Sequence, residues 1–203
     1  MCHPAHPLPA RRRGPAALRW LAWALWGCCF FAGLTPGLAQ DPVAKEYQIK
    51  AAYLYNFAKF VEWPAPAFTN NESPLVIGVF GPNPFGDELI AIAKDHKING
   101  RSIVIKHVAT LAEARGVHLM FFGDTEDGHI AGTLAALKEN GVLTVGESEK
   151  FIASGGMISF VLEENRVRFE INAAAAERQG MKISAQLLKL AKTVRNEPRQ
   201  LPP

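Results

Sequence analysis

The chain has 203 residues with 22 basic and 19 acidic side chains, and its formal net charge is +3. The first 39 residues hold four of the arginines, all three cysteines and three of the four tryptophans, but no acidic residue. The remaining 164 residues carry 18 basic and 19 acidic side chains and no cysteine. This body therefore excludes disulfides, thiol catalysis and cysteine-ligated metal sites, and it provides no strong basic field for nucleic acid.

Residues 1–39 have the pattern of a secretory signal peptide. Arg11 to Arg19 make a positive region, Trp20 to Leu34 make an apolar run, and Gly37-Leu38-Ala39 has the small residues of a cleavage site. The apolar run is short for a membrane span, which needs about 20 residues, so a cleaved leader is favoured over an uncleaved anchor. A lipoprotein signal at Cys28 is a weaker alternative, because bulky Trp26 stands where a small residue is required. We therefore expect export and cleavage near Ala39.

Residues 40–194 are expected to form one domain, followed by a loose tail over 195–203. Apolar residues at helical spacing predict a helix over Glu46–Glu62, with Ile49 and Phe57 in its apolar stripe, and Pro64 ends it. Helices then alternate with short apolar runs that predict strands. The expected order is strand 75–80, helix 84–94, strand 102–108, strand 117–122, helix 130–139 and strand 142–145.

The pattern changes near the C-terminus. Residues 157–162 and 167–171 predict a β-hairpin, with the turn at 163–166. Asn172 is expected to cap a helix over the alanine run, and Ser184 a last helix. The apolar stripe of that last helix is expected to consist of Leu187, Leu190, Ala191 and Val194. The predicted fold class is α/β: a single three-layer domain with a mostly parallel sheet, helices on both faces, and an antiparallel hairpin near the C-terminus.

The motifs that carry catalysis or hold cofactors are missing. Gly81 and Gly86 have the spacing of a phosphate loop, but Asp87 and Glu88 stand where lysine and serine or threonine belong. No dinucleotide-binding glycine pattern follows a strand, and no serine lies in a nucleophile elbow. The sequence therefore predicts a protein that is not an enzyme and holds no cofactor.

An acidic segment follows the strand predicted at 117–122. Asp124, Glu126, Asp127 and His129 could hold a hard cation or a histidine-ligated ion. Acidic residues are also favoured at a helix N-terminus by the helix dipole alone. This second interpretation is preferred, because the EF-hand spacing is not met, and no metal site is predicted.

Five residues are candidates for binding a partner or a ligand. Trp63 is either a plug of the core or an exposed anchor for a partner. Asn83 and Phe85 lie in a loop expected at the carboxyl end of a strand, where α/β sheets bind ligands. Arg166 and Arg168 on the hairpin could bind an anion or an acidic partner, or could be a solvated edge.

The sequence resembles the YfiR/HmsC family of periplasmic proteins. The resemblance rests on several motifs that follow one another in order from about Tyr47 to Val194. These motifs are Ile49–Phe57 continuing to Phe60–Pro64, Val142–Val145, Phe151–Ile158, Arg166–Asn172 and Ile183–Ala191.

The resemblance implies a non-catalytic α/β domain in the periplasm. Such proteins repress an inner-membrane diguanylate cyclase by binding its periplasmic sensor domain, which controls cyclic di-GMP and biofilm formation. A homodimer is also implied, as are disulfides for stability and redox sensing, but the body of this chain has no cysteine, so disulfide-based redox control cannot operate in it. A periplasmic small-molecule binding protein is the main alternative. An enzyme built from His118, Asp124, Glu126 or His129 is the weakest one.

Overall fold

The computed structural model describes residues 41–123, 127–138 and 140–196, and not the side chains of residues 127–129. The predicted signal peptide, most of the acidic segment at 124–129 and the end of the predicted tail lie outside the described residues. By contacts between residues, the chain divides into two units, residues 1–39 and 40–203. The following paragraphs concern the second unit.

Helices and strands alternate through most of this unit. The helices are α2 (Pro42–Phe60), α3 (Glu88–Asp95), α4 (Asp127–Leu137), α5 (Ala173–Arg178) and α6 (Ala185–Leu190), with short 3-10 helices η1 (Ala65–Ala67) and η2 (Leu111–Ala114). The strands are β1 (Val61–Glu62), β2 (Leu75–Phe80), β3 (Lys97–Ile98), β4 (Arg101–Val108), β5 (Leu119–Phe122), β6 (Leu143–Gly146), β7 (Ile158–Glu163), β8 (Arg166–Asn172), β9 (Lys182–Ile183) and β10 (Thr193–Arg195).

An eight-stranded sheet has the order β10-β8-β7-β6-β5-β2-β4-β3. The neighbours from β7 through β6, β5 and β2 to β4 are all parallel. The hairpin β7–β8 and the short edge pair β3–β4 are antiparallel. The predicted fold class, a mostly parallel sheet with an antiparallel hairpin, is therefore confirmed.

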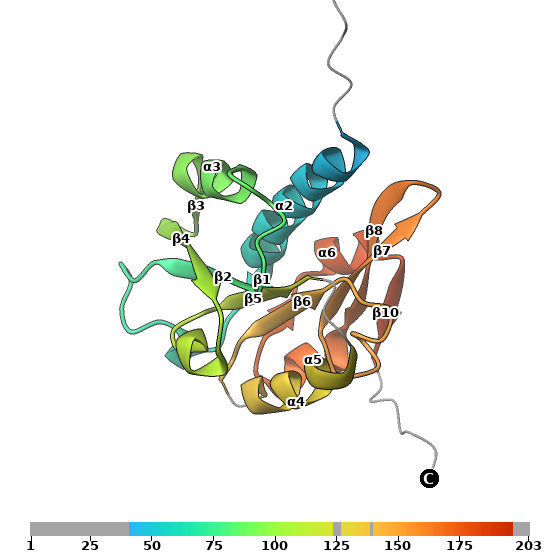
Figure 1. The fold of residues 1–203 in the computed structure, drawn as a ribbon. Coiled ribbons are helices and arrows are strands. Elements are labelled where there is room, and N and C mark those ends of the chain that lie inside the picture. The colour runs from blue at the N-terminus through green and yellow to red at the C-terminus, as the bar shows by residue number, and fades with distance from the viewer. Residues whose placement is uncertain (1–40, 124–126, 139, 197–203) are drawn as a thin grey trace, which may run out of the picture. The chain divides into compact units, whose positions relative to one another are not determined.

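Helices cover both faces of this sheet (Figure 1). On one face, α2 and α3 pack over a large apolar cluster that includes Leu54, Phe57 and Phe121. On the other face, η2 and α4 pack over a second cluster that includes Phe122 and Phe151. Alternate residues of a strand point to opposite faces, so Phe121 and Phe122 of β5 serve different clusters.

The first helix begins four residues earlier than the sequence predicts. The Asp41 carboxylate caps it by accepting a hydrogen bond of 3.0 Å from the Val43 amide, and Pro42 occupies the first helical position, where a missing N–H does no harm. The stripe of buried residues also differs from the predicted one. It contains Lys50, Ala51, Leu54, Phe57 and Ala58, whereas Ile49 is 40% exposed.

Near the C-terminus both predicted helix caps are confirmed. Asn172 accepts a hydrogen bond from the Ala175 amide and Ser184 accepts one from the Leu187 amide. Of the predicted apolar stripe of the last helix only Leu187 is buried within the helix, and Leu190 is 58% exposed. α6 ends at Leu190, because Ala191 takes an extended conformation, and Val194 lies in β10 beside Ile171 of β8. β10 also contains Arg195, the first residue of the predicted tail.

None of the helices in the described part of the chain combines the length and apolar character that a membrane crossing requires.

Candidate functional site

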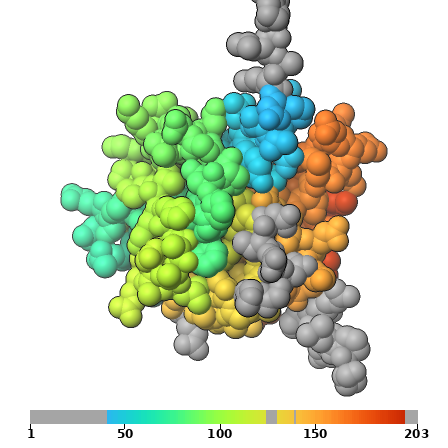
Figure 2. Space-filling model, viewed as in Figure 1, coloured from blue at the N-terminus to red at the C-terminus, as the bar shows by residue number. Residues whose placement is uncertain are grey.

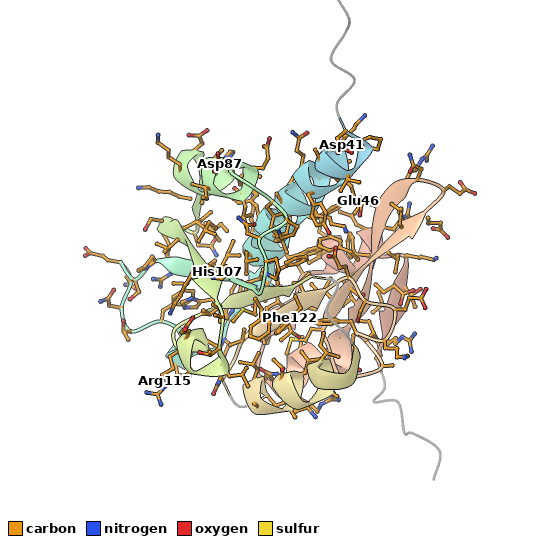
Figure 3. All side chains as sticks on the ribbon, in the orientation of Figure 1. Asp41, Glu46, Asp87, His107, Arg115 and Phe122 are labelled. Carbon is orange, nitrogen blue, oxygen red and sulfur yellow. The ribbon has the colours of Figure 1, made fainter. Side chains whose placement is uncertain are left out.

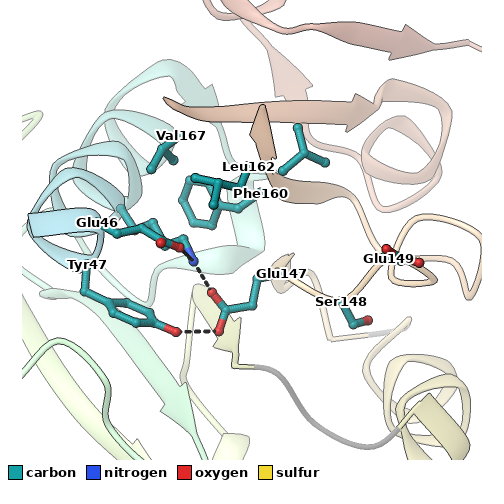
Figure 4. Close-up of a pocket in the computed structure, with 10 residues that line it drawn as sticks. Glu46, Tyr47, Glu147, Ser148, Glu149, Phe160, Leu162 and Val167 are labelled. Atoms are coloured by element: carbon teal, nitrogen blue, oxygen red, sulfur yellow. Dashed lines mark hydrogen bonds and ion pairs between the residues drawn. The ribbon is translucent and has the colours of Figure 1, made fainter. Parts of the chain in front are cut away.

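A pocket opens between the N-terminal half of α2 and the β7–β8 hairpin, at the carboxyl end of β6. It encloses about 310 Å³ and has charged residues on one side and apolar residues on the other (Figure 4). Its lining consists of Glu46, Tyr47, Lys50, Glu147, Ser148, Glu149, Phe160, Val161, Leu162 and Val167.

The charged side is built around Lys50, which is only 6% exposed. Its ammonium group lies 2.6 Å from a carboxylate oxygen of Glu46, one helical turn earlier, and also donates to the Glu147 carboxylate. The Tyr47 hydroxyl donates to the other oxygen of Glu147 at 3.0 Å, and its ring centroid lies 4.5 Å from the Lys50 ammonium. These contacts satisfy a buried cation that would otherwise destabilise the helix.

Glu147 reaches this position because it directly follows β6. The Glu147 side chain is 8% exposed, so the ion pair with Lys50 connects α2 to the end of the sheet in a largely desolvated setting. The chain then turns back through residues 148–156 to begin β7, and the Phe151 ring fills the space between Gly146 and Gly156. A side chain at either glycine would overlap that ring, so both close approaches require glycine.

A second pocket of about 320 Å³ continues the first toward the start of α2. The two pockets share Glu46, Leu162 and Val167, and so form one continuous depression. We call this depression the α2–hairpin groove, lined by the residues of the first pocket together with Pro42, Lys45, Ile49 and Asn165. Figure 3 shows Glu46 on the side of α2 that faces the hairpin, and Figure 2 shows the two elements side by side on one face of the molecule.

The chemistry of this groove suits binding. Three carboxylates and one ammonium group line the first pocket, and its apolar wall comes from Phe160, Leu162 and Val167. The Ser148 hydroxyl is buried and has no hydrogen-bond partner, and no histidine lies beside it among the lining residues. Among the residues that the structure describes, no group of three or more potential metal ligands comes together.

The predicted site residues lie apart from this groove. Trp63 is half-buried and packs edge-on against Phe68, with ring centroids 6.3 Å apart, while its indole N–H is buried without a partner. The structure thus places the ring beside the core and not on an open surface.

Asn83 and Phe85 hold their own loop together. The Asn83 side chain accepts a hydrogen bond from the Phe85 amide at 3.0 Å and donates one to the Gly86 carbonyl at 3.1 Å. The Phe85 ring is 2% exposed and packs against Tyr47 and Phe121. This ring packs against β5 in the loop that follows β2, and the pocket described above lies at the end of β6.

Arg166 and Arg168 are both exposed on β8. They flank Val167, whose side chain is buried and lines the groove from the opposite face of the strand. The structure therefore brings the two arginines to the outer side of the hairpin, close to each other but away from Trp63 and Phe85.

His118 has a structural position at the other end of the parallel strands. Its Nδ1 accepts a hydrogen bond from the Val76 amide at 3.1 Å, which leaves Nε2 to donate to the Ala67 carbonyl at 2.9 Å. Its ring stacks on Phe68, and the Arg101 guanidinium lies 3.9 Å from the centre of the Phe68 ring. Burial lowers the pKa of His118 below its ordinary value of 6.5, although the hydrogen bond to Ala67 acts in the opposite direction.

The sequence-based prediction missed Glu46, Lys50 and Glu147. One signal was present: Lys50 lies among Ala51, Leu54 and Phe57 on the stripe of α2 that the structure buries. A lysine on a buried stripe implies a buried carboxylate partner. Glu147 could not be identified as that partner, because the two residues are 97 positions apart.

Comparison with known proteins gives a family match and two solved structures with a partial likeness to this chain. The family described as YfiR/HmsC-like matches residues 47–192, whereas the comparison with curated proteins found no match. A crystal structure of a conserved domain protein from Vibrio cholerae O1 biovar El Tor is 15% identical, with a TM-score of 0.52, and the match covers 71% of this chain. The ABC domain from Streptococcus pneumonia, solved in complex with L-Trp, is 14% identical, with a TM-score of 0.46 and 75% of this chain covered. This chain spans 60% of the length of each, and the likeness to the first supports a shared fold only.

Proposed function

The chain belongs to the YfiR/HmsC-like family, and on that premise we propose that it binds and represses the periplasmic sensor domain of an inner-membrane diguanylate cyclase or a related signalling protein. Family membership supports, in general terms, a periplasmic regulator of cyclic di-GMP signalling. The proposal adds three points: the partner is a membrane-bound signalling protein, binding lowers the activity of that partner, and this chain is not itself an enzyme.

The observation that carries the proposal is the extent of the family match. Residues 47–192 begin in the first turns of α2 and end just after α6, so the match includes the hairpin side of the α2–hairpin groove and its α2 side from Tyr47 onward, but not Pro42, Lys45 or Glu46. The groove supports a binding role, because it combines apolar and charged walls without an arrangement of nucleophile and base.

Deletion of the gene tests the proposal in cells. We expect cyclic di-GMP to rise in the deletion strain and to return to its original level when the full chain is supplied in trans. We also expect the protein to co-purify with the periplasmic domain of a membrane cyclase encoded beside it. Unchanged cyclic di-GMP after deletion would reject the repressor function.

A small-molecule binding protein is the second candidate, favoured by the pocket at the carboxyl end of β6. A pocket of about 310 Å³ there is large enough for a small ligand. A thermal-shift screen with amino acids, nucleotides and metal ions tests this candidate, and the absence of any shift would count against it. The two functions are compatible if a ligand controls release of the partner.

A further inference from the structure

We propose that the α2–hairpin groove is the surface that docks the partner protein, and that it receives a basic side chain flanked by apolar residues of that partner. This inference rests on the proposed function for the existence of a protein partner. It adds where the partner binds and which chemistry the groove recognises.

The apolar part of the inference comes from the distribution of exposed side chains. The described residues include seven large apolar side chains that are well exposed, namely Val43, Ile49, Ile90, Val104, Leu111, Leu162 and Leu190. Ile49 and Leu162 line the groove, and Val43 lies in the first turn of the same helix. Val43, Ile49 and Leu162 are 57%, 40% and 59% exposed, respectively. Apolar side chains gathered around one depression indicate an interaction surface.

The charge of the groove selects the kind of residue that enters it. Glu46, Glu147 and Glu149 line the first pocket against a single cation, Lys50. An ammonium or guanidinium group from the partner would therefore be attracted to this pocket, and a carboxylate would be repelled. The rings of Tyr47 and Phe160 already lie beside the Lys50 ammonium, so the attraction for the partner's cation comes from the carboxylates.

The extent of the groove favours a protein over a small amine. A small molecule that filled the first pocket would leave Ile49, which lines only the second pocket, in contact with water. A peptide segment can place its basic side chain in the pocket and cover the apolar rim with the residues on either side. The exposed rim and the acidic floor thus fit one occupant, a segment in which a lysine or arginine lies between apolar residues.

Site-specific photo-crosslinking of the full chain in its own host tests this docking site. Ile49 and Leu162 are each replaced by p-benzoylphenylalanine. Matched controls carry the same replacement at Ile90, which is also helical and 51% exposed, and at Leu190, which is 58% exposed. We expect positions 49 and 162 to crosslink one periplasmic domain, through a peptide that contains a basic residue next to apolar residues. We expect positions 90 and 190 to give little or no adduct, because neither side chain lines the groove.

A charge variant tests the recognition chemistry. In the chain that crosslinks from position 162, Glu46→Gln is expected to reduce the yield several-fold, whereas Glu177→Gln, at an exposed position of α5, leaves it unchanged. If positions 49 and 162 give no protein adduct, the proposed docking site is wrong. This holds even if deletion of the gene raises cyclic di-GMP. A groove occupied by a free amine instead of a protein would also give no protein adduct. An acidic crosslinked peptide, or no effect of Glu46→Gln, overturns the recognition chemistry. If the adduct is as proposed but deletion leaves cyclic di-GMP unchanged, the groove is still the docking site of a protein partner, and the cyclase-repressor function is wrong.

Discussion

Lys50 connects the first helix to the end of β6, and its partners make its removal costly. Lys50→Met leaves the Glu147 carboxylate, whose side chain is 8% exposed, without its cation. Breaking one side of a buried ion pair typically costs about 3–5 kcal/mol. We therefore expect a loss of that order in the free energy of unfolding, measured by urea denaturation.

Two further variants separate the contribution of the ion pair to stability from that of side-chain packing. Lys45→Met changes an exposed lysine on the same helix and is expected to alter stability by less than about 0.5 kcal/mol. Lys50→Met combined with Glu147→Gln removes the stranded charge and is expected to recover much of the loss. A double variant as unstable as Lys50→Met alone would show that packing, and not charge, determines the effect.

His118 predicts a dependence of stability on pH. Because burial lowers its pKa below 6.5 in the folded chain, the unfolded chain binds a proton first as the pH falls. The free energy of unfolding therefore keeps the full contribution of His118 above pH 6.5 and loses it as the pH falls from 6.5 through the folded-state pKa. Protonation at Nδ1 would also break the hydrogen bond from the Val76 amide.

Urea denaturation at a series of pH values from about 7.5 to about 5 measures this dependence. We expect His118→Asn to be less stable than the original chain at neutral pH but to show a shallower decline as the pH falls. His107→Asn, at an exposed position of β4, should retain the original decline. An unchanged slope in His118→Asn would assign the pH dependence to other groups.

The turn between β6 and β7 determines the shape of the groove floor, because it carries Glu147, Ser148 and Glu149. Gly146 and Gly156 hold the Phe151 ring from two sides, so a new methyl group at Gly146 cannot be relieved by moving the ring. Gly146→Ala is expected to cost about 1–3 kcal/mol, the usual range for overpacking a core. Phe151→Leu in the same chain should recover part of that loss.

A glycine in open space provides the matched control for this element. Gly132 lies within α4, and no neighbouring atom lies within 4 Å of the place that a methyl group on its Cα would take. Gly132→Ala is therefore expected to stabilise the helix by about 0.5–1 kcal/mol, because it removes backbone entropy from the unfolded chain. Thermal unfolding of both variants measures the difference. Equal effects of Gly146→Ala and Gly132→Ala on stability would contradict the prediction that a methyl group at position 146 overlaps the Phe151 ring.

At the scale of elements, the sequence predicts what local patterns determine. The strands, the hairpin and the caps at Asn172 and Ser184 depend on residues a few positions apart, and the structure confirms them. The end of α6 depends instead on the pairing of β10 with β8, which no local pattern contains. The groove combines both cases: Glu46 and Lys50 are one turn apart on α2, but Glu147 reaches them only through the fold of the sheet.

At the scale of the whole molecule, the groove and His118 lie at opposite ends of the parallel strands. Glu147 follows the carboxyl end of β6, whereas His118 precedes β5 and contacts the loop that leads into β2. Substitutions at the two places share no contact, and their effects on stability are therefore expected to add. A variant of His118 can consequently change stability without changing partner binding.

The body of the chain has no cysteine, so the stability of this unit comes from noncovalent interactions and not from disulfides. Residues 40–203 contain a sheet covered on both faces by apolar clusters, and every cysteine lies before residue 40. Because a reductant acts on disulfides, we expect the melting temperature of a chain that begins at residue 40 to be the same with and without dithiothreitol. In cells that produce only this body with a cysteine-free leader, repression of the cyclase should likewise be indifferent to reductant. A melting temperature that falls by several degrees with dithiothreitol would contradict this expectation, and a change in cyclic di-GMP alone would place the redox sensor in the partner.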